Sequence, residues 1–223
     1  MALQRKVTVL GGGMWGCVLA QHLSNKNAKV TIWEFVPSLA ESLKKTRRHA
    51  QIPGFRLSGS IKVTHDVAVA VKDVDVLLFV LPSRALAATA KNIRRFNLKR
   101  TAVAVNASKG VEPSSLATMG DIVSRELPSL KGRVWTLTGP SFAREVARGV
   151  PTGLLLGGPK GANAKALVSL FDGGALNVRH WPDRIGVELG GSLKNAIAIG
   201  AGILAGLGPG ANTKAALLVQ GLA

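Results

Sequence analysis

The fold of this chain follows from the segment KVTVLGGGMWGCVLAQHLSNKNAKVTIWE (Lys6–Glu34). Its apolar start, Lys6–Leu10, predicts a short buried strand that runs directly into the glycine-rich turn Gly11–Gly16. A helix is expected at Gly16–Asn25, and a second strand at Lys29–Trp33 is followed at once by an acidic residue. A strand, a glycine turn, a helix and a second strand within about 30 residues are typical of a unit that binds a dinucleotide.

Three glycines of the turn follow the spacing G-x-G-x-x-G, and each has a separate task. Gly11 allows the tight turn, Gly13 lets the backbone approach a pyrophosphate, and Gly16 lets the helix pack on the strand. Free N–H groups at the start of the helix then face the phosphates. The alternative is an ordinary glycine-rich turn, but the flanking strands, helix and acid favour nucleotide binding.

The residues after the second strand bear on the choice of cofactor. Glu34 is expected to accept hydrogen bonds from the adenosine ribose hydroxyls, which favours NAD because a 2′-phosphate would meet a carboxylate. Arg47 and Arg48 argue for NADP, since either guanidinium would neutralise that phosphate. Phe35 is expected to pack on the adenine, the alternative being a simple core or rim aromatic.

Expected strands and helices alternate through the next part of the chain. We expect further strands at Lys62–Thr64, Val74–Leu81, Thr101–Asn106, Arg133–Thr138 and Thr152–Gly157, and helices at Asp66–Val71, Leu86–Asn92, Glu112–Arg125 and Ala162–Phe171. Such alternation predicts an α/β fold with a doubly wound (Rossmann), mostly parallel sheet. Ligands bind beyond the carboxyl ends of the strands in such sheets, where Pro82–Ser83, Lys109 and Gly139–Ser141 are also expected.

Near residue 183 the alternation stops and long helical segments follow. We expect these helices at Glu188–Leu207 and Asn212–Ala223. Asn212 is the predicted N-cap of the second helix. We therefore divide the chain into a dinucleotide-binding Rossmann domain, residues 1–183, and the beginning of a helical substrate and catalytic domain, residues 184–223. A unit of about 40 residues would not be stable alone.

Lys194 is the only ionisable residue between Glu188 and Lys214, within a stretch of mostly small and apolar residues. A lysine in such a segment must reach water, pair with an anion or lose its proton. One interpretation is a solvated lysine on the rim of a helix. The other is a lysine that carries out acid–base chemistry or holds an anionic substrate.

Composition narrows the class of protein. The chain has 223 residues, with 29 Lys and Arg against 12 Asp and Glu, a formal net charge of +17. The charge is scattered and no aromatic residues interleave with it, so we expect attraction to anionic small molecules and not nucleic-acid binding. The single cysteine, Cys17, rules out an internal disulfide. We expect no cleavable leader and no metal site. We also expect no membrane span, because the apolar run Ala196–Leu207 is short and glycine-rich.

Several blocks of the sequence together resemble the NAD(P)-dependent glycerol-3-phosphate dehydrogenases. The blocks are GGGMWG (Gly11–Gly16), VLLFVLPS (Val76–Ser83), NASKGVEP (Asn106–Pro113), TGPSFAREVARGVPT (Thr138–Thr152) and ELGGSLKNAIAIGAG (Glu188–Gly202). They follow in the family's order and run over essentially the whole chain. The resemblance implies reduction of dihydroxyacetone phosphate by NAD(P)H to glycerol 3-phosphate, and the reverse reaction, in glycerophospholipid synthesis and carbohydrate metabolism.

The resemblance also implies roles for individual residues. It makes Lys194 the acid–base residue and Lys109 the group that holds cofactor and substrate oxygens. The implied further substrate contacts are Gly139, Ser141 and Asn195, and the implied cofactor contacts are Gly11, Gly13, Met14, Trp15, Gly16, Glu34, Phe35, Lys109 and Ala143. Plainer interpretations remain for three of these residues: Lys109 as a surface lysine, Ser141 as a helix N-cap and Asn195 as a partner of backbone groups.

The sequence also departs from the family pattern. In the family a further helical region carries an aspartate near the catalytic lysine and an Arg-Asn pair that grips the substrate phosphate. Within the part present, Ala205 and Ala211 stand where relatives commonly have aspartates, and Gln220 where an arginine is common. We therefore expect a C-terminally truncated chain with an intact cofactor site, a half-built substrate site and doubtful activity.

These departures leave other functions open. One is a pseudoenzyme or fragment that binds NAD(P) without turnover, and another is a different reductase with the same two-domain plan. We expect a small phosphate-bearing substrate and a cytoplasmic location, with a plastid or microbody as alternatives. A homodimer is also left open.

Overall fold

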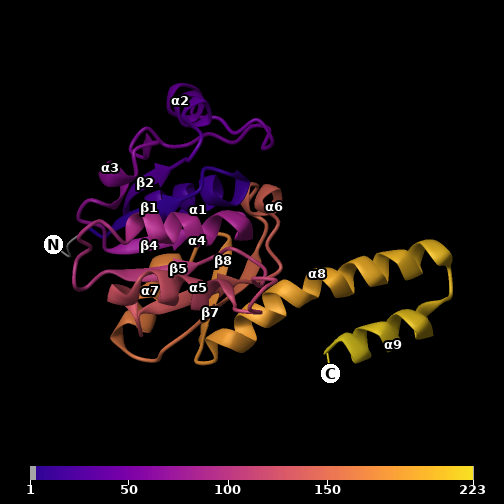
Figure 1. Cartoon of the computed structure of the whole chain (residues 1–223). Helices are drawn as coiled ribbons and strands as arrows, with labels where there is room; N and C mark the ends of the chain where they lie inside the picture. Colours follow the sequence, from indigo (N-terminus) through magenta and orange to yellow (C-terminus); the bar gives the residue numbers. More distant parts are fainter. Residues whose placement is uncertain (1–3, 223) are drawn as a thin grey trace.

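The computed structural model describes residues 4–222. The first three residues of the expected Rossmann domain and the last residue of the expected helical domain lie outside the described residues. The described part contains an eight-stranded sheet with helices on both faces and two helices that extend away from it (Figure 1). The strands are β1 (Lys6–Leu10), β2 (Lys29–Trp33), β3 (Lys62–Thr64), β4 (Val76–Phe79), β5 (Val103–Asn106), β6 (Val134–Thr138), β7 (Thr152–Gly157) and β8 (Leu176–Trp181).

The order of the strands confirms the predicted doubly wound sheet. It is β3-β2-β1-β4-β5-β6-β7-β8, and every neighbouring pair is parallel except β6 with β7. The first six strands therefore have the order of a dinucleotide-binding sheet, with their carboxyl ends at one edge. Strands β4 and β5 are buried along their whole length, as expected for apolar strands covered on both faces.

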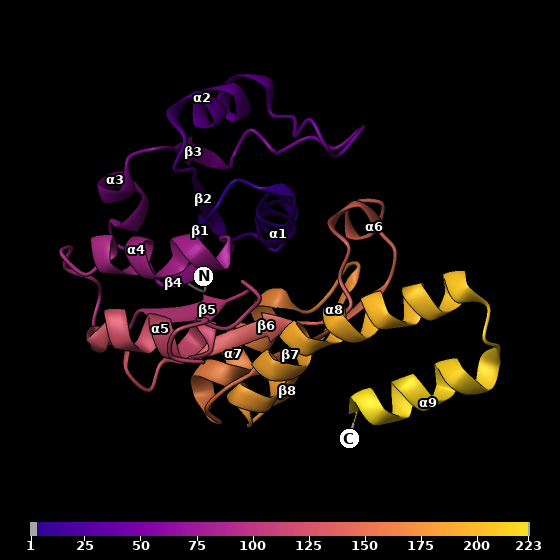
Figure 2. The ribbon, with the colours of Figure 1, turned by 45° about the vertical axis from the view of Figure 1, so that its right-hand side comes forward.

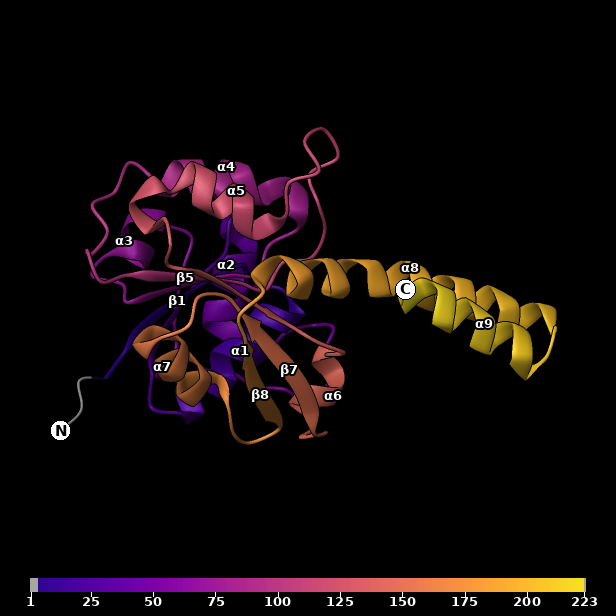
Figure 3. The ribbon, with the colours of Figure 1, turned by 90° about the horizontal axis from the view of Figure 1, so that it is seen from below.

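Helices cover the two faces of the sheet in separate layers (Figure 3). One face carries α1 (Met14–Asn25), α6 (Ala143–Ala147) and α7 (Ala162–Phe171), and the other carries α3 (Val67–Val71), α4 (Ser83–Ile93) and α5 (Met119–Glu126). Helix α2 (Pro37–Thr46) packs beside β3. A short 3₁₀ turn, η1 (Pro128–Leu130), leads into β6.

The expected helix Glu112–Arg125 is wrong in its first half. Helix α5 begins only at Met119, because Thr118 and Asp121 form a capping box that satisfies the first backbone N–H groups. The residues before it form a turn, in which Val111 bridges Thr118 and Glu112 N donates to Ala117 O at 2.9 Å. Strand β8 and helices α2 and α6 were not predicted.

The last two helices form a hairpin that projects from the sheet (Figures 1 and 2). Helix α8 (Arg184–Leu207) begins four residues earlier than predicted, because the Asp183 carboxylate accepts from Gly186 N and caps it. Helix α9 (Ala211–Leu222) already includes Asn212, so the prediction of Asn212 as N-cap is wrong.

Only the first turns of α8 pack on the sheet, against β6 and β7. Farther along, the hairpin leaves Leu193, Ile199, Ile203, Leu207, Leu218 and Val219 exposed. By length and composition alone, α8 is long and apolar enough to cross a bilayer. Only 6% of its most apolar 18-residue segment is buried in the fold. This is weak support for a membrane span, since one end of the helix is docked on a sheet.

We predict that part of the stability of the fold is lost in acid through Asp75. Partial burial alone would raise the pKa of Asp75, but hydrogen bonds from Lys99 Nζ and Lys6 N, together with the charges of Lys99 and Arg5, lower it below the ordinary value of 3.8. The lowered pKa means that the stabilisation is present above 3.8 and disappears as pH falls through the folded-state pKa.

Asp75→Asn should therefore lower the free energy of unfolding by about 1–2 kcal/mol near neutral pH, the range of a charged hydrogen bond reduced by solvent screening. The difference from the unmodified chain should shrink as the pH falls well below the ordinary aspartate value. Urea unfolding at a series of pH values measures it. A difference that stays constant down to strongly acidic pH would contradict the assignment.

Candidate active site

The glycine turn has the backbone geometry that its sequence requires. Gly11 has φ +117°, and a Cβ there would lie 2.3 Å from Val80 O. A Cβ on Gly16 would lie 2.0 Å from Gly11 O, so the helix can approach the turn only without a side chain. Gly13 differs, because a Cβ there would meet nothing within 4 Å. The space beside Gly13 is where a pyrophosphate would approach the backbone.

Helix α1 begins at the turn and leaves its first donors free. Gly13 is its N-cap and provides no side-chain hydrogen bond. Uncapped N–H groups and the positive end of the helix dipole suit an anionic phosphate. Met14 and Trp15 in this first turn are half-buried and pack against the core.

The carboxylate of Glu34 braces the turn in a way that was not predicted. Its Oε2 accepts from Gly12 N at 2.9 Å and its Oε1 accepts from Val36 N at 3.0 Å. Each carboxylate oxygen still has a free lone pair that can accept from a ribose hydroxyl. Cys17 lies behind the turn, where burial, and secondarily the charge of Glu34, raises the pKa of its thiol to about 12.

The side chains near Glu34 differ in whether they are exposed or already held by a hydrogen bond. Phe35 is 74% exposed and lies edge-on to Trp33, with ring centroids 6.1 Å apart. The guanidinium of Arg47 is held by the carbonyl of Ile61, whereas Arg48 is exposed. Arg47 is therefore already engaged, so the argument from it for a 2′-phosphate is weaker than the sequence indicated.

The loop after β5 places Lys109 at the carboxyl edge of the sheet. Asn106 shapes this loop, because its Oδ1 accepts from Ser108 N at 3.0 Å and its Nδ2 donates to Ser108 O at 3.1 Å. Ser108 Oγ in turn accepts from Leu81 N at 2.9 Å, which ties the loop to the end of β4. Lys109 follows, half-buried, and Gly110 has φ +118°.

Lys194 reaches the same edge from α8. Its Nζ donates to Gly139 O at 2.9 Å, directly after β6. This approach depends on Gly191 one turn earlier, where a Cβ would lie 2.4 Å from Thr138 Oγ1. Gly139 is needed for packing as well, because a Cβ there would lie 2.4 Å from Gly153 O. A groove of about 710 Å³ between α8 and the sheet includes both Gly139 and Lys194.

The charge of Lys194 acts on Lys109. Burial, and secondarily the positive charge of Lys194, lowers the pKa of Lys109 below its ordinary value of 10.5. The backbone places the two residues at the same edge, because Gly110 N, next to Lys109, donates at 2.9 Å to Ser192 Oγ, two residues before Lys194 on α8. Two neighbouring cations at one edge of a sheet are suited to a small anionic ligand.

The other predicted site residues lie around this pair. Ser141 is half-buried and its Oγ donates to Gly139 O at 3.3 Å. It is not a helix N-cap, since α6 starts two residues later and Phe142 occupies that position. Ala143 begins α6 and packs against the core. Asn195 is exposed, and its side chain makes no hydrogen bond with another described residue.

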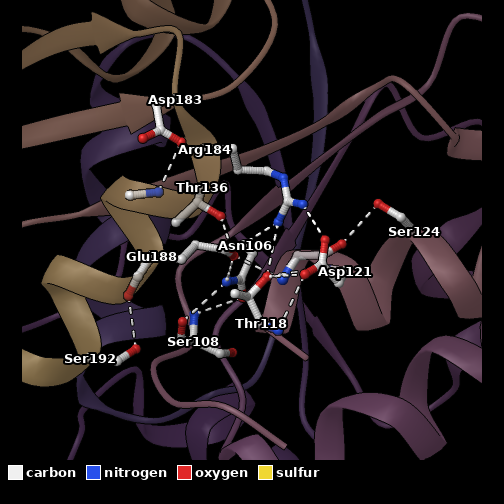
Figure 4. A network of polar contacts seen from close by, with 12 residues as sticks. Asn106, Ser108, Thr118, Asp121, Ser124, Thr136, Asp183, Arg184, Glu188 and Ser192 are labelled. Carbon is white, nitrogen blue, oxygen red and sulfur yellow. Dashed lines mark hydrogen bonds and ion pairs between the residues drawn. The ribbon is translucent and has the colours of Figure 1, made fainter. Parts of the chain in front are cut away.

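Sequence reasoning missed the polar residues that hold this edge together (Figure 4). Glu188 is 5% exposed and contacts side chains or backbone from β5, β6 and α5. Arg184, Asn106 and Ser192 belong to the same network. A carboxylate six residues before a lysine, at the start of a predicted helix with no other charged residue, was the available signal. Within residues 4–222, no cluster of three or more His, Cys, Asp or Glu is suited to a metal.

Comparison with known proteins identifies the family. The profile described as "NAD-dependent glycerol-3-phosphate dehydrogenase N-terminus" matches residues 6–164, and the corresponding C-terminus profile matches residues 183–223. The chain belongs to the NAD-dependent glycerol-3-phosphate dehydrogenase family. The resemblance inferred from the sequence blocks is thereby confirmed.

Individual relatives agree with this family. The chain is 42% identical over 219 residues to glycerol-3-phosphate dehydrogenase [NAD(P)+] of Syntrophobacter fumaroxidans, covering 97% of this chain and 64% of the relative. It is 40% identical over 223 residues to the enzyme of the same name from Geobacter sp., covering 99% and 66%. The crystal structure of glycerol-3-phosphate dehydrogenase from Coxiella burnetii superposes with a TM-score of 0.88 at 30% identity, covering 98% and 66%. The chain thus spans just under two thirds of the length of these dehydrogenases.

Two alanine substitutions should separate the two kinds of glycine in the turn. Gly13→Ala adds a methyl group to open space, so the melting temperature should stay within a few degrees while NADH affinity falls about tenfold or more, ~1.4 kcal/mol or above. Gly16→Ala places a methyl group against Gly11 O and should lower the free energy of unfolding by about 1–3 kcal/mol. Thermal unfolding and fluorescence titration with NADH measure both effects. Unchanged NADH affinity in Gly13→Ala would contradict the proposed approach of the pyrophosphate.

Proposed function

We propose that this chain carries the NAD(P) site and the acid–base lysine of a dehydrogenase that interconverts dihydroxyacetone phosphate and sn-glycerol 3-phosphate. The observation that carries the proposal is the position of Lys194. Its Nζ lies at the carboxyl edge of the sheet, beside Gly139 and coupled to Lys109. The glycine turn after β1 opens at the same edge. A hydride donor and a proton donor would therefore meet there.

The residues around the glycine turn fit a dinucleotide. The open space beside Gly13 and the uncapped start of α1 would accept the pyrophosphate, and Glu34 would accept the ribose hydroxyls. We propose Gly11, Gly13, Met14, Trp15, Gly16, Phe35, Lys109 and Ala143 as further contacts. When bound, the nicotinamide supplies hydride to the ketone or accepts it from the alcohol. The relatives are named for use of NAD(P)+, and the engagement of Arg47 leaves NAD favoured here.

Lys194 is proposed to move the proton that the reaction requires. In the reduction, the ketone carbon gains a hydride, and the oxygen that becomes negative takes a proton from the Lys194 ammonium. In the oxidation, the amine takes that proton from the alcohol. The hydrogen bond to Gly139 O holds Nζ at the edge of the sheet while leaving two further N–H bonds of the ammonium for a substrate oxygen.

Lys109 and the neighbouring polar groups are proposed to bind and orient the substrate. The paired charges of Lys109 and Lys194 attract an anionic phosphate ester, and they also stabilise negative charge on the reacting oxygen. Gly139 and Ser141 lie next to the Lys194 ammonium, and Asn195 follows it on α8. We propose these three residues as further substrate contacts.

A binding module without turnover is the second candidate. Among the ion pairs of residues 4–222, none involves Lys194, and the distal part of α8 leaves Ile199, Ile203 and Leu207 exposed. A site with a bound dinucleotide and incomplete support for substrate would retain affinity for NADH and lose catalysis.

The domain division, assembly and location are proposed with the same function. The N-cap at Asp183 and the start of α8 at Arg184 support a boundary near residue 183. The exposed apolar residues of the α8–α9 hairpin support self-association, including a homodimer. We place the enzyme in the cytoplasm, at the junction of carbohydrate metabolism and glycerophospholipid synthesis.

Turnover separates the two candidate functions. Purified chain with NADH and dihydroxyacetone phosphate should oxidise NADH, and Lys194→Ala should reduce kcat by about 100-fold or more, the usual contribution of general acid–base catalysis. NADH affinity should be unchanged in that variant. Lys214→Ala, a half-buried lysine on α9, is the matched control and should retain activity. Tight NADH binding without turnover in the unmodified chain would support the binding module instead.

A further inference from the structure

The buried carboxylate of Glu188 is the centre of a polar network that the proposed chemistry does not use (Figure 4). Its Oε1 accepts three hydrogen bonds, from Thr136 Oγ1 at 2.6 Å, Gly120 N at 2.8 Å and Asn106 Nδ2 at 3.0 Å. Its Oε2 accepts from the guanidinium of Arg184. The donors come from β6, α5, β5 and α8, so one side chain joins four elements.

The surroundings of Glu188 leave it little freedom. A Cβ on Gly120 would lie 2.7 Å from Glu188 Oε1, so the backbone at the start of α5 directly contacts the carboxylate. Arg184 also pairs with Asp121 and donates to Thr118 Oγ1 at 3.2 Å, which fixes the guanidinium on the other side. A carboxylate enclosed by donors of this kind holds its helix in one position, since any shift of α8 would break several hydrogen bonds at once.

Two links connect this network to the lysines. On α8, Ser192 Oγ donates to the backbone carbonyl of Glu188 at 2.9 Å and accepts from Gly110 N, also at 2.9 Å. Gly110 directly follows Lys109. On β5, the Asn106 side chain that donates to Glu188 also shapes the loop that leads to Lys109. Glu188 thus holds both the helix of Lys194 and the loop of Lys109.

We propose that Glu188 is a positioning residue that sets the distance between Lys194 and Lys109. It acts by clamping the first turns of α8 onto the ends of β5 and β6. An effect of Glu188 on catalysis rests on the proposed function. Its effect on the positions of the two lysines is independent of that function. Glu188 touches neither lysine, so its effect passes through α8 and the Asn106 loop.

The pKa of Lys109 reports this placement independently of turnover. Lys194 is the charged group that lowers it, in addition to burial. If Glu188→Gln releases α8, the charge of Lys194 moves away from Lys109 and the pKa of Lys109 rises. If Glu188 were simply a nearby negative charge, its removal would destabilise the Lys109 ammonium and lower that pKa. The direction of the change therefore separates a positioning role from a through-space charge effect.

The experiment is an NMR titration of the full chain with ¹³Cε-labelled lysine, the Lys109 signal being assigned by its loss in Lys109→Gln. Lys194→Met first gives the rise in the pKa of Lys109 when the neighbouring charge is removed. Glu188→Gln should reproduce most of that rise. Asp121→Asn is the matched control, because it removes the other ion pair of Arg184 and leaves the contacts of Glu188 with Asn106 and Thr136 in place. This variant should leave the pKa of Lys109 within about 0.2 of the unmodified value.

A milder variant covers the case in which Glu188→Gln does not fold. Thr136→Val removes one donor to Glu188 Oε1 while keeping the shape and the charge, and it should raise the pKa of Lys109 by a smaller amount in the same direction. If the chain turns over substrate, Glu188→Gln should lower kcat about tenfold or more and leave the Kd for NADH unchanged.

The proposal is overturned if the pKa of Lys109 stays constant or falls in folded Glu188→Gln, or if Asp121→Asn shifts it equally. When Glu188→Gln does not fold, an unshifted Lys109 in Thr136→Val has the same meaning. A chain without turnover would remove the catalytic proposal and leave the NMR result as the test of positioning.

Discussion

The candidate active site depends on the docking of α8 against the sheet, and the buried carboxylate of Glu188 holds that docking in place. Glu188 is 5% exposed and its oxygens accept four hydrogen bonds, one of them from the ion-paired Arg184. Removing one partner of a buried ion pair typically costs about 3–5 kcal/mol, because the other charge is left without a partner. Close approach also requires Gly191 against Thr138 and Gly120 against Glu188. Small residues and one carboxylate therefore decide where Lys194 lies.

The cofactor half of the site rests on a different constraint. The turn after β1 is determined by Gly11 and Gly16, which allow contacts no side chain would permit, and by Glu34, which braces the turn through Gly12 N. These contacts lie among the ends of β1, β2 and β4 and the start of α1, and they share no residue with the Glu188 network. The two halves can therefore fail separately. A chain with a sound glycine turn and a loosened α8 would bind the dinucleotide and lose the lysine pair.

Much of the sheet could be predicted from sequence because its strands are short apolar runs bounded by glycine or by polar residues. The bounds of β1, β2, β3, β7 and helix α7 agree with the prediction, as does the doubly wound order. The expected helix before Met119 was wrong, since periodicity gave no sign that the Thr118–Asp121 capping box starts the helix later. The antiparallel direction of β7 was not foreseen, because alternation of strands and helices carries no information on an added edge of the sheet.

In the candidate site, the sequence predicted residues that stand out from their neighbours in the chain. It did not predict residues whose role depends on partners distant in the sequence. Lys194 was conspicuous as a lone charge in an apolar helix, and Lys109 as a lysine after a strand. Glu188 was overlooked because its partners, Asn106, Gly120 and Thr136, are 82, 68 and 52 residues away in the sequence. Glu34 was assigned only to the ribose, since its hydrogen bond to Gly12 N spans the whole strand–helix–strand unit. Long-range hydrogen bonds of this kind leave no periodic pattern.

Hydrogen exchange at two backbone amides tests the docking of α8 most directly. Gly120 N donates to Glu188 Oε1 and Gly110 N donates to Ser192 Oγ, so both amides are protected only while α8 is clamped to the sheet. We predict that both exchange as slowly as the amides of the central strands β4 and β5, and far more slowly than those of α9. Exchange of Gly120 and Gly110 at the rate of exposed amides, with β4 and β5 still protected, would contradict the account.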